Sequence, residues 1–497
     1  MRTRNARLAW LLGAALFAYY LLILGGHHYS IDGIVMFESA KQLFFRQSLA
    51  LDPPVTWGDR VFRVNSFSVG LMLAYLPALA LTSPLFYRMP SLQLTPYDPA
   101  LAHNPALYGN LAYLLCAWVN PLITALTGSL VFVIARRLGL TPGWAVIATL
   151  VYGVASPAAP YARYDFSQPL AGLALTATVW ALIEAARDQR LRWLVGAGSA
   201  LGGMLLTRPD LGVLIAWIGA WLAAGSRRSG WRAAAVRLFA VAVTVAIGLA
   251  FYLWANHARF GDWRRTGHGS LTHLFFARAV MRHPGISSPV AGALGLLASP
   301  SHGVLIFCPV AWLALPGLVL LARERHPAGT LWAGVLASAL MLYAPLYMWW
   351  GGWSWGPRFL VPVVPALVLA ATFWAFRAWA RGARWRTRLF AGLAVLGFVI
   401  AWNGIVFDFV LYYRWVEKTM YLPETAATRF VLAASPLVSG WRFLRTTPVD
   451  LLLLRMGEFA GWPGTVAAAL IAACLLGCLV WTGRRIRATL REEAARQ

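Results

Sequence analysis

The stretch LAWLLGAALFAYYLLILGGHHYSIDGIVMFESAKQLFF, residues 8–45, places a long apolar run directly beside charged side chains, the first of which is Asp32. The apolar run is long enough to cross a bilayer as one helix. Three arginines precede it, as in a secretory signal, but the run is long and no small-residue cleavage site follows it. We therefore predict an uncleaved first transmembrane helix with an acid just outside its far end.

The rest of the composition is also that of a membrane protein. Of the 497 residues, 59% are apolar and only 12% are charged, and 25 are tryptophan. These values are typical of polytopic membrane proteins and argue against a soluble one. The formal net charge is +25, but basic residues of a multispanning protein usually collect on the cytoplasmic side. We therefore attribute the positive charge to residues that set the orientation of the protein in the membrane, and we expect no nucleic-acid partner.

Thirteen apolar runs have spanning length or nearly so, and the arginine clusters decide which of them cross. The arginine clusters near residues 136, 190, 230, 325, 380 and 485 all lie on the same side of the membrane only if the run at 66–86 does not cross it. The runs lie near residues 8–25, 66–86, 107–135, 143–160, 169–186, 193–207, 209–225, 236–256, 303–321, 329–348, 359–379, 389–408 and 461–481. We predict an all-α polytopic membrane protein with about 12 transmembrane helices and a juxtamembrane helix at 66–86.

This topology divides the chain unevenly between the two sides. Both termini are predicted to be cytoplasmic, and the long segments 26–106, 257–302 and 409–460 are extracytoplasmic. We expect a transmembrane catalytic module at 1–408, a small outer segment at 409–460, and a last helix with a basic tail at 461–497. The long outer segments indicate that the protein works outside, in the plasma or inner membrane.

Two short apolar halves, 193–207 and 209–225, meet at the turn LTRPD, which contains Arg208 and Asp210. At about 1.5 Å per residue each half is shorter than a hydrocarbon core of about 30 Å. The turn therefore lies below the outer surface, where charged irregular backbone survives only inside protein or beside a wet cavity. Arg208 and Asp210 either close the turn as an ion pair or serve a functional site.

Asp32 has two readings. As an acid just outside the first span, it could face a cavity and act in chemistry. Alternatively, SIDG is a helix start, where Ser or Asp commonly caps the first turn. Asp165 and Arg163, in the outer turn PYARYDFSQP, are further candidates, although a transporter gate could look the same.

A third region of interest is MWWGGWSWGPRFLVPVVP, residues 348–365, which contains Arg358. Tryptophans at the end of a span are typical of an aromatic belt. The glycines let the backbone approach a ligand closely, and Arg358 at a helix start could bind a phosphate. The sequence has no phosphate-binding loop, no dinucleotide fingerprint and no histidine spacing that indicates a metal site. We expect no metal and no cofactor, and a donor that arrives through the membrane.

The order of these features resembles the glycosyltransferase-C (GT-C) superfamily, in particular its protein O-mannosyltransferases, aminoarabinose transferases and phospholipid-carrier-dependent glycosyltransferases. The similarity covers nearly the whole chain. It rests on the motifs YSIDG, IARRLGL, YARYDFSQPLAGL, GGMLLTRPD, NHARFGDWRRTG, LLASPSHGVLIFCPV and WGGWSWGPRFLVPVVP, together with the helix at 66–86. Two features depart from the family: Gly33 replaces the second acid of the usual Asp-Glu pair, and Arg63 stands where a Lys-Pro-Pro is expected.

The resemblance implies an inverting glycosyltransferase that moves a sugar from a polyprenyl-phosphate carrier to an acceptor hydroxyl of a glycan, lipid or protein on the outer face. Asp32 maps onto the catalytic base. The candidates for binding the lipid phosphate are Arg358, Arg208, Arg163 and Arg63, and those for a second acid near the acceptor are Asp165 and Glu38. The alternative is a transporter or flippase of a lipid-linked substrate, although no repeated hydropathy pattern favours it.

Overall fold

The computed structural model describes residues 2–57, 60–94, 111–226, 230–267, 269–270, 288–346 and 348–494. Within these ranges nearly all regular structure is helical, which confirms the predicted all-α polytopic membrane protein. Nine of the described helices are long and apolar enough to cross a membrane, and four further apolar helices are shorter. Helix Val69–Arg88 is among the nine by length and composition, so its place on the surface and the number of 12 crossings stay predictions.

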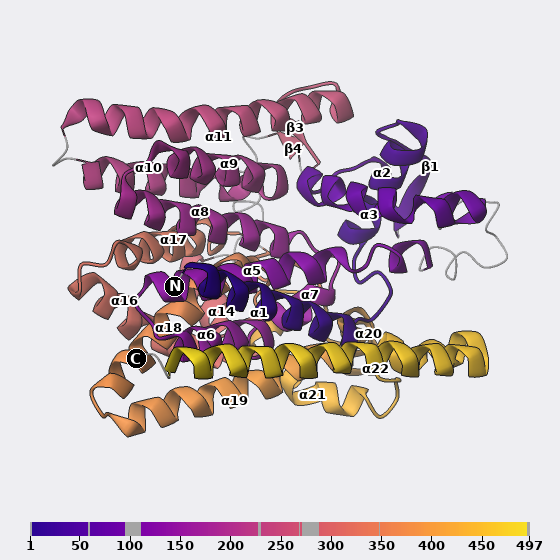
Figure 1. The fold of residues 1–497 in the computed structure, drawn as a ribbon. Coiled ribbons are helices and arrows are strands. Elements are labelled where there is room, and N and C mark those ends of the chain that lie inside the picture. Colours follow the sequence, from indigo (N-terminus) through magenta and orange to yellow (C-terminus); the bar gives the residue numbers. More distant parts are fainter. Residues whose placement is uncertain are drawn as a thin grey trace.

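The helices run side by side as a bundle (Figure 1). Its members before the midpoint are α1 (Arg2–Leu22), α5 (Val119–Arg137), α6 (Pro142–Val154), α7 (Ala158–Arg163), α8 (Gln168–Asp188), α9 (Leu191–Thr207), α10 (Val213–Ser226) and α11 (Trp231–Phe260). Those after it are α14 (Pro289–Ala298), α15 (Val304–Phe307), α16 (Ala314–Arg323), α17 (Pro327–Tyr343), α18 (Val364–Ala380), α19 (Arg384–Val406) and α22 (Leu452–Ala494).

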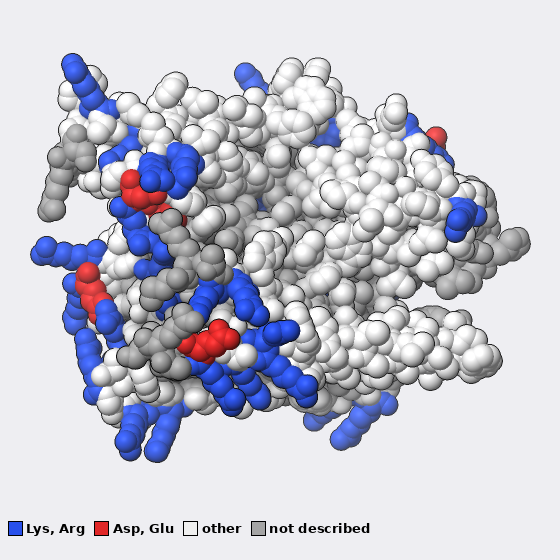
Figure 2. Space-filling view, in the orientation of Figure 1, with Lys and Arg blue, Asp and Glu red and all other residues white. Residues whose placement is uncertain are grey.

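The two ends of the bundle differ in chemistry. Both chain termini lie at one end, on the left of Figure 1, and Figure 2 shows Lys and Arg gathered at that same end. The opposite end holds α2 (Ile31–Arg46), α3 (Val69–Arg88) and the hairpin of β1 (Ala50–Trp57) and β2 (Arg60–Val64). The segment after α19 adds α20 (Phe409–Met420) and α21 (Pro436–Phe443).

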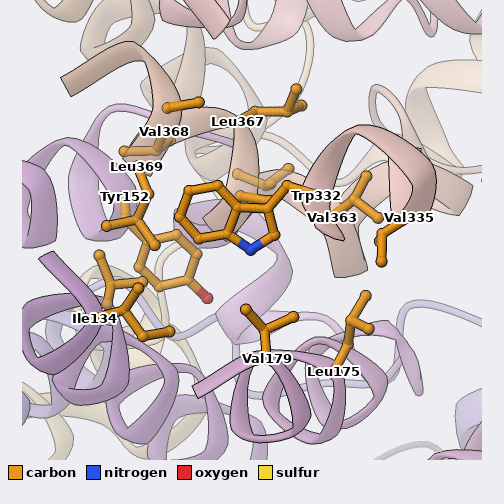
Figure 3. Close-up of a cluster of buried hydrophobic side chains, with 14 of the residues drawn as sticks. Ile134, Tyr152, Leu175, Val179, Trp332, Val335, Val363, Leu367, Val368 and Leu369 are labelled. Atoms are coloured by element: carbon orange, nitrogen blue, oxygen red, sulfur yellow. The ribbon is translucent and has the colours of Figure 1, made fainter. Parts of the chain in front are cut away.

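The core of the bundle is built from large apolar side chains of α5, α6, α8, α17 and α18. In Figure 3, Trp332 of α17 lies among Val179, Leu175 and Ile134, and it is 1% exposed. Elsewhere small residues bring helices together: a Cβ on Gly248 of α11 would overlap the backbone of Gly202 in α9. Close approach at small residues is a common way to pack helices in a membrane.

Several predicted boundaries need correction. The run 143–160 is divided between α6 and α7, and the run 303–321 is divided at Cys308 between α15 and a 3₁₀ turn (Pro309–Leu313) that leads into α16. The second break follows from Pro309, since a proline disfavours helical dihedrals in the residue before it. The hairpin β1–β2 was not predicted, because Pro53 and Pro54 argue against a strand; the pairing register shifts at this point, as at a bulge.

Candidate active site

The carboxylate of Asp32 is free to face outward because a neighbouring residue caps its helix. Ser30 is the N-cap of α2, and its hydroxyl accepts from the backbone N–H of Gly33. Asp32 therefore lies in the first turn with its side chain available, and Oδ2 accepts a hydrogen bond from Nη2 of Arg358. SIDG is thus a helix start, as the alternative reading predicted, and of the two candidate caps it is Ser30 and not Asp32 that caps it.

Arg358 is the first residue of a 3₁₀ turn (Arg358–Val363) that leads into α18. Its Nη1 donates to the carbonyl oxygen of Gly351 at 2.9 Å, and its guanidinium lies 3.9 Å from the ring centroid of Phe166. Gly351 has φ +83°, a left-handed conformation that glycine adopts at little cost. The glycine-rich loop thus folds back onto the arginine and fixes the direction in which its guanidinium points.

A second guanidinium joins this pair through an amide. With the Gln168 amide oriented so that its oxygen faces the two arginines, Oε1 accepts from Nε of Arg358 at 3.1 Å and from Nη1 of Arg208 at 2.6 Å. Arg208 also donates from Nε to Oδ1 of Asp210 at 2.9 Å. Tyr343 completes the group, with its hydroxyl 2.7 Å from Oδ2 of Asp210 and 3.0 Å from Nη2 of Arg208.

This network of Asp32, Arg358, Gln168, Arg208 and Asp210 is assembled from four separate parts of the chain and is accessible. The side chain of Asp32 is 21% exposed, that of Asp210 is 17% exposed, and the two arginine side chains are each 14% exposed. Two guanidiniums and two carboxylates balance in charge. Their partial exposure lets a ligand reach them, in contrast to the buried side chains of Arg163, Asp165 and Glu38.

Arg163 lies apart from this network in a buried ion pair. It is 1% exposed, and its Nη2 donates to Oδ2 of Asp450 at 2.6 Å. Tyr29 donates to the same carboxylate oxygen at 2.8 Å, and His27 lies 2.8 Å from the other oxygen. This arrangement ties the end of α1 to the start of α22, and its burial suits a structural role.

The titration of this buried group is shifted by its neighbours. Burial alone would lower the pKa of His27, but the Asp450 carboxylate outweighs burial and raises the pKa of His27 to about 9. Burial alone would raise the pKa of Asp450, whereas Arg163 and His27 hold it well below its usual range. At neutral pH the group therefore carries a charged histidine and a charged carboxylate.

Asp165 is fully buried beside the start of α2. Its Oδ1 accepts from the backbone N–H of Tyr29 at 3.2 Å and from the hydroxyl of Ser30 at 3.1 Å, and its Oδ2 lies 2.8 Å from Nδ1 of His28. A Cβ on Gly33 would overlap this carboxylate. Asp165 thus holds the start of α2 in place, and Gly33 provides the space for it.

The two remaining predicted residues also lie outside the network. Glu38 is fully buried and pairs at 3.0 Å with Nζ of Lys41, one turn further along α2. Burial raises the pKa of Glu38, and Lys41 opposes the rise. Arg63 is exposed on strand β2. Neither residue hydrogen-bonds to Asp32 or Arg358 in the part of the chain that the structure describes.

Gln168 and Tyr343 were not predicted from the sequence. Gln168 stands in the motif YARYDFSQPLAGL, but an uncharged amide at a helix start gives no signal of its own. Tyr343, near the end of a span, is typical of an aromatic belt. Only the fold shows that both contact Arg208.

No protein-family model matches this sequence, and a search among curated proteins finds no match. Among solved structures, the chain is similar to ArnT from Cupriavidus metallidurans bound to undecaprenyl phosphate, with 13% identity over 97% of this chain and 76% of ArnT and a TM-score of 0.45. The apo state of ArnT gives 14% identity, coverages of 96% and 74%, and a TM-score of 0.48.

A third similar structure is the archaeal oligosaccharyltransferase AglB from Archaeoglobus fulgidus, in complex with an inhibitory peptide and a dolichol-phosphate. It shares 12% identity over 85% of this chain and 59% of AglB, with a TM-score of 0.46. In all three comparisons the similarity extends along most of this chain, whereas few residues are identical.

Proposed function

We propose that this protein is a glycosyltransferase that moves a sugar, with inversion, from a polyprenyl-phosphate carrier to an acceptor hydroxyl. The observation that carries the proposal is the accessible pair of Asp32 and Arg358, which Gln168 joins to Arg208. This surface offers a carboxylate that can take a proton beside two guanidiniums that can hold a phosphate in bidentate contacts. The motifs that resemble the GT-C superfamily contribute all four of these residues.

In the proposed step, the acceptor oxygen attacks the anomeric carbon as its proton passes to Asp32. The bond from the anomeric carbon to the phosphate oxygen breaks, and the electron pair leaves with the polyprenyl phosphate. A positioned carboxylate base contributes roughly 10²–10⁴ in rate. Cations that are already in position where negative charge develops on the phosphate often make the largest single contribution to the rate in such sites.

The ion pair between Asp32 and Arg358 couples these two events. While Asp32 is ionised, it shares the charge of the Arg358 guanidinium. When Asp32 takes the proton, that attraction is lost, and Arg358 becomes free to compensate the leaving phosphate. Arg208 remains paired with Asp210 throughout, so it is suited to binding the phosphate in both ground and transition states.

We place this site on the extracytoplasmic side. The arginine-rich end of the bundle, which also holds both termini, is the cytoplasmic end by the positive-inside rule. Helix α2, which presents Asp32, lies at the opposite end. The donor sugar would therefore be presented on the outer face, with its isoprenoid chain in the bilayer.

The deciding experiment is Asp32→Asn in full-length protein reconstituted into liposomes. The reaction mixture contains a panel of labelled polyprenyl-phosphate sugars and a cell-envelope fraction as acceptor, and glycoside formation is measured. We expect transfer to fall by about 10²–10⁴. The matched control is Asp52→Asn, because Asp52 is an exposed acid of the same outer segment and should leave transfer unchanged.

Two results would overturn the proposal. Full transfer by Asp32→Asn would remove Asp32 from the mechanism. Movement of the labelled lipid between leaflets by the wild-type protein, with no glycoside formed from any donor, would favour a transporter of a lipid-linked substrate.

A further inference from the structure

A second accessible polar feature lies at the arginine-rich end of the bundle, opposite the candidate active site. A groove of about 450 Å³ is formed by α16, the end of α18 and the first turn of α19. One part of its wall is apolar and the other is basic. The apolar part includes Leu315, Val319, Leu320 and Trp374, and the basic part consists of Arg323, Arg377, Arg381 and Arg386.

The positive charge of this groove is largely uncompensated. Arg377 pairs with Glu324. In the described ranges, no carboxylate lies within ion-pair distance of Arg323, Arg381 or Arg386. Arg386 instead lies over the ring of Trp374, 5.7 Å from its centroid. The groove thus has four guanidiniums and one carboxylate, which is paired with Arg377, so three positive charges remain for a ligand.

The arrangement of the two wall types matches an amphipathic anion. Arg323 ends α16 and Arg381 follows α18, so these arginines stand at the ends of two apolar helices, where basic residues commonly flank a membrane span. Val319 and Leu320 lie about one turn before Arg323 along α16. A chain that follows the apolar wall into the bilayer would therefore carry its head group to the arginines.

We propose that this groove binds an anionic phospholipid of the cytoplasmic leaflet, with the phosphodiester among the four arginines and one acyl chain along α16 and α18. Basic grooves between transmembrane helices on the cytoplasmic side are suited to such head groups. The apolar wall would contribute nothing to binding free inorganic phosphate. The proposal is independent of the chemistry at Asp32, a residue of α2, and that helix lies at the other end of the molecule (Figure 1).

The test uses the full chain in nanodiscs that contain either phosphatidylglycerol or phosphatidylcholine, with retained lipid counted by native mass spectrometry. The wild-type protein should retain phosphatidylglycerol and exchange phosphatidylcholine freely. The variant R323Q/R381Q should bind phosphatidylglycerol about 30-fold more weakly, since each basic residue near a lipid surface contributes roughly 5-fold. Both arginines are exposed, so the variant is expected to fold.

The matched control is R384Q/R388Q, which removes two exposed arginines from the same end of α19 without altering the groove wall. It should retain lipid as the wild type does. A third variant, Val319→Trp, fills the groove without a change in charge and should also reduce retention. Equal loss in the two double variants, or equal retention of both lipids by the wild type, would overturn the proposal.

Discussion

The Asp32 carboxylate and the Arg358 guanidinium form an ion pair although 326 positions separate them in the sequence. The pair joins the segment after the first helix to the glycine-rich loop before α18. Its formation depends on Ser30, which caps α2 and leaves the acid of the first turn free. The carboxylate and the guanidinium that the proposed mechanism requires thus lie in direct contact.

The two network arginines should be sensitive even to a conservative change. Arg358→Lys and Arg208→Lys each keep a positive charge but lose the planar set of donors that binds a phosphate in two contacts. We expect kcat/KM for the polyprenyl-phosphate sugar to fall by about 10²-fold or more, as when one donor to a developing oxyanion is removed. Arg63→Gln, on the exposed hairpin, is the control and should transfer normally; a comparable loss there would restore Arg63 to the site.

Gln168 should behave as a positioning residue that couples the two arginines. Gln168→Leu removes the shared acceptor at similar size, so both guanidiniums should be less well oriented. We expect a loss that is not additive with Arg208→Lys, with a coupling energy of about 0.5–3 kcal/mol in a double-mutant cycle of transfer rates. Strict additivity would mean that the amide does not link them.

Gly33→Ala tests how the start of α2 is held. The added methyl group would overlap the Asp165 carboxylate, so either α2 or Asp165 must move. Because Asp165 holds the start of α2, both changes would displace Asp32 from Arg358. We expect lower transfer and a lower unfolding temperature. Gly392→Ala, on α19 where nothing lies within 4 Å of the new Cβ, provides the comparison and should change neither.

Removing one partner of the buried pair of Arg163 and Asp450 should destabilise the protein strongly. Arg163→Met leaves a buried carboxylate without its closest cation, which typically costs about 3–5 kcal/mol. Unfolding in detergent, followed by circular dichroism, should show the loss. The double variant Arg163→Met/Asp450→Asn should recover part of it, because no unpaired carboxylate remains. A single variant as stable as the wild type would show that the pair contributes little.

The His27 and Asp450 pair predicts a stability change at alkaline pH. The pKa of His27 is about 9 in the folded chain, against about 6.5 when unfolded. A group whose pKa is raised on folding stabilises the protein fully at pH values below its pKa in the unfolded chain. This stabilisation is lost as the pH rises through its pKa in the folded chain. The free energy of unfolding should therefore fall by about 3 kcal/mol between pH 6 and pH 10.

His27→Gln serves as the comparison for this pH series. It cannot acquire the positive charge, so its stability should change less over the same range. If wild type and His27→Gln lose stability in parallel, the alkaline change originates from other groups.

Part of the candidate site can be predicted from the sequence, because charged side chains in or beside a membrane span are costly and therefore rare. A charged turn at membrane depth indicates Arg208, an acid just outside the first span together with the resemblance to GT-C motifs indicates Asp32, and a glycine-rich helix start indicates Arg358. The same criteria also selected Arg163, Asp165, Glu38 and Arg63. Burial and contacts separate these: Arg163, Asp165 and Glu38 are buried with partners, whereas Arg63 is exposed on a hairpin and has no hydrogen bond to Asp32 or Arg358 among the described residues.

Hydropathy and charge bias are properties of single segments, so the chain alone predicts a helical bundle with a basic end and an acid beyond its first span. Which charges meet is set by the packing of the helices against one another. Whether a guanidinium reaches a substrate or closes a buried pair depends on contacts between segments hundreds of residues apart. An uncharged side chain such as Gln168 does not stand out in the sequence, so its contact with both arginines becomes visible only when the helices are packed.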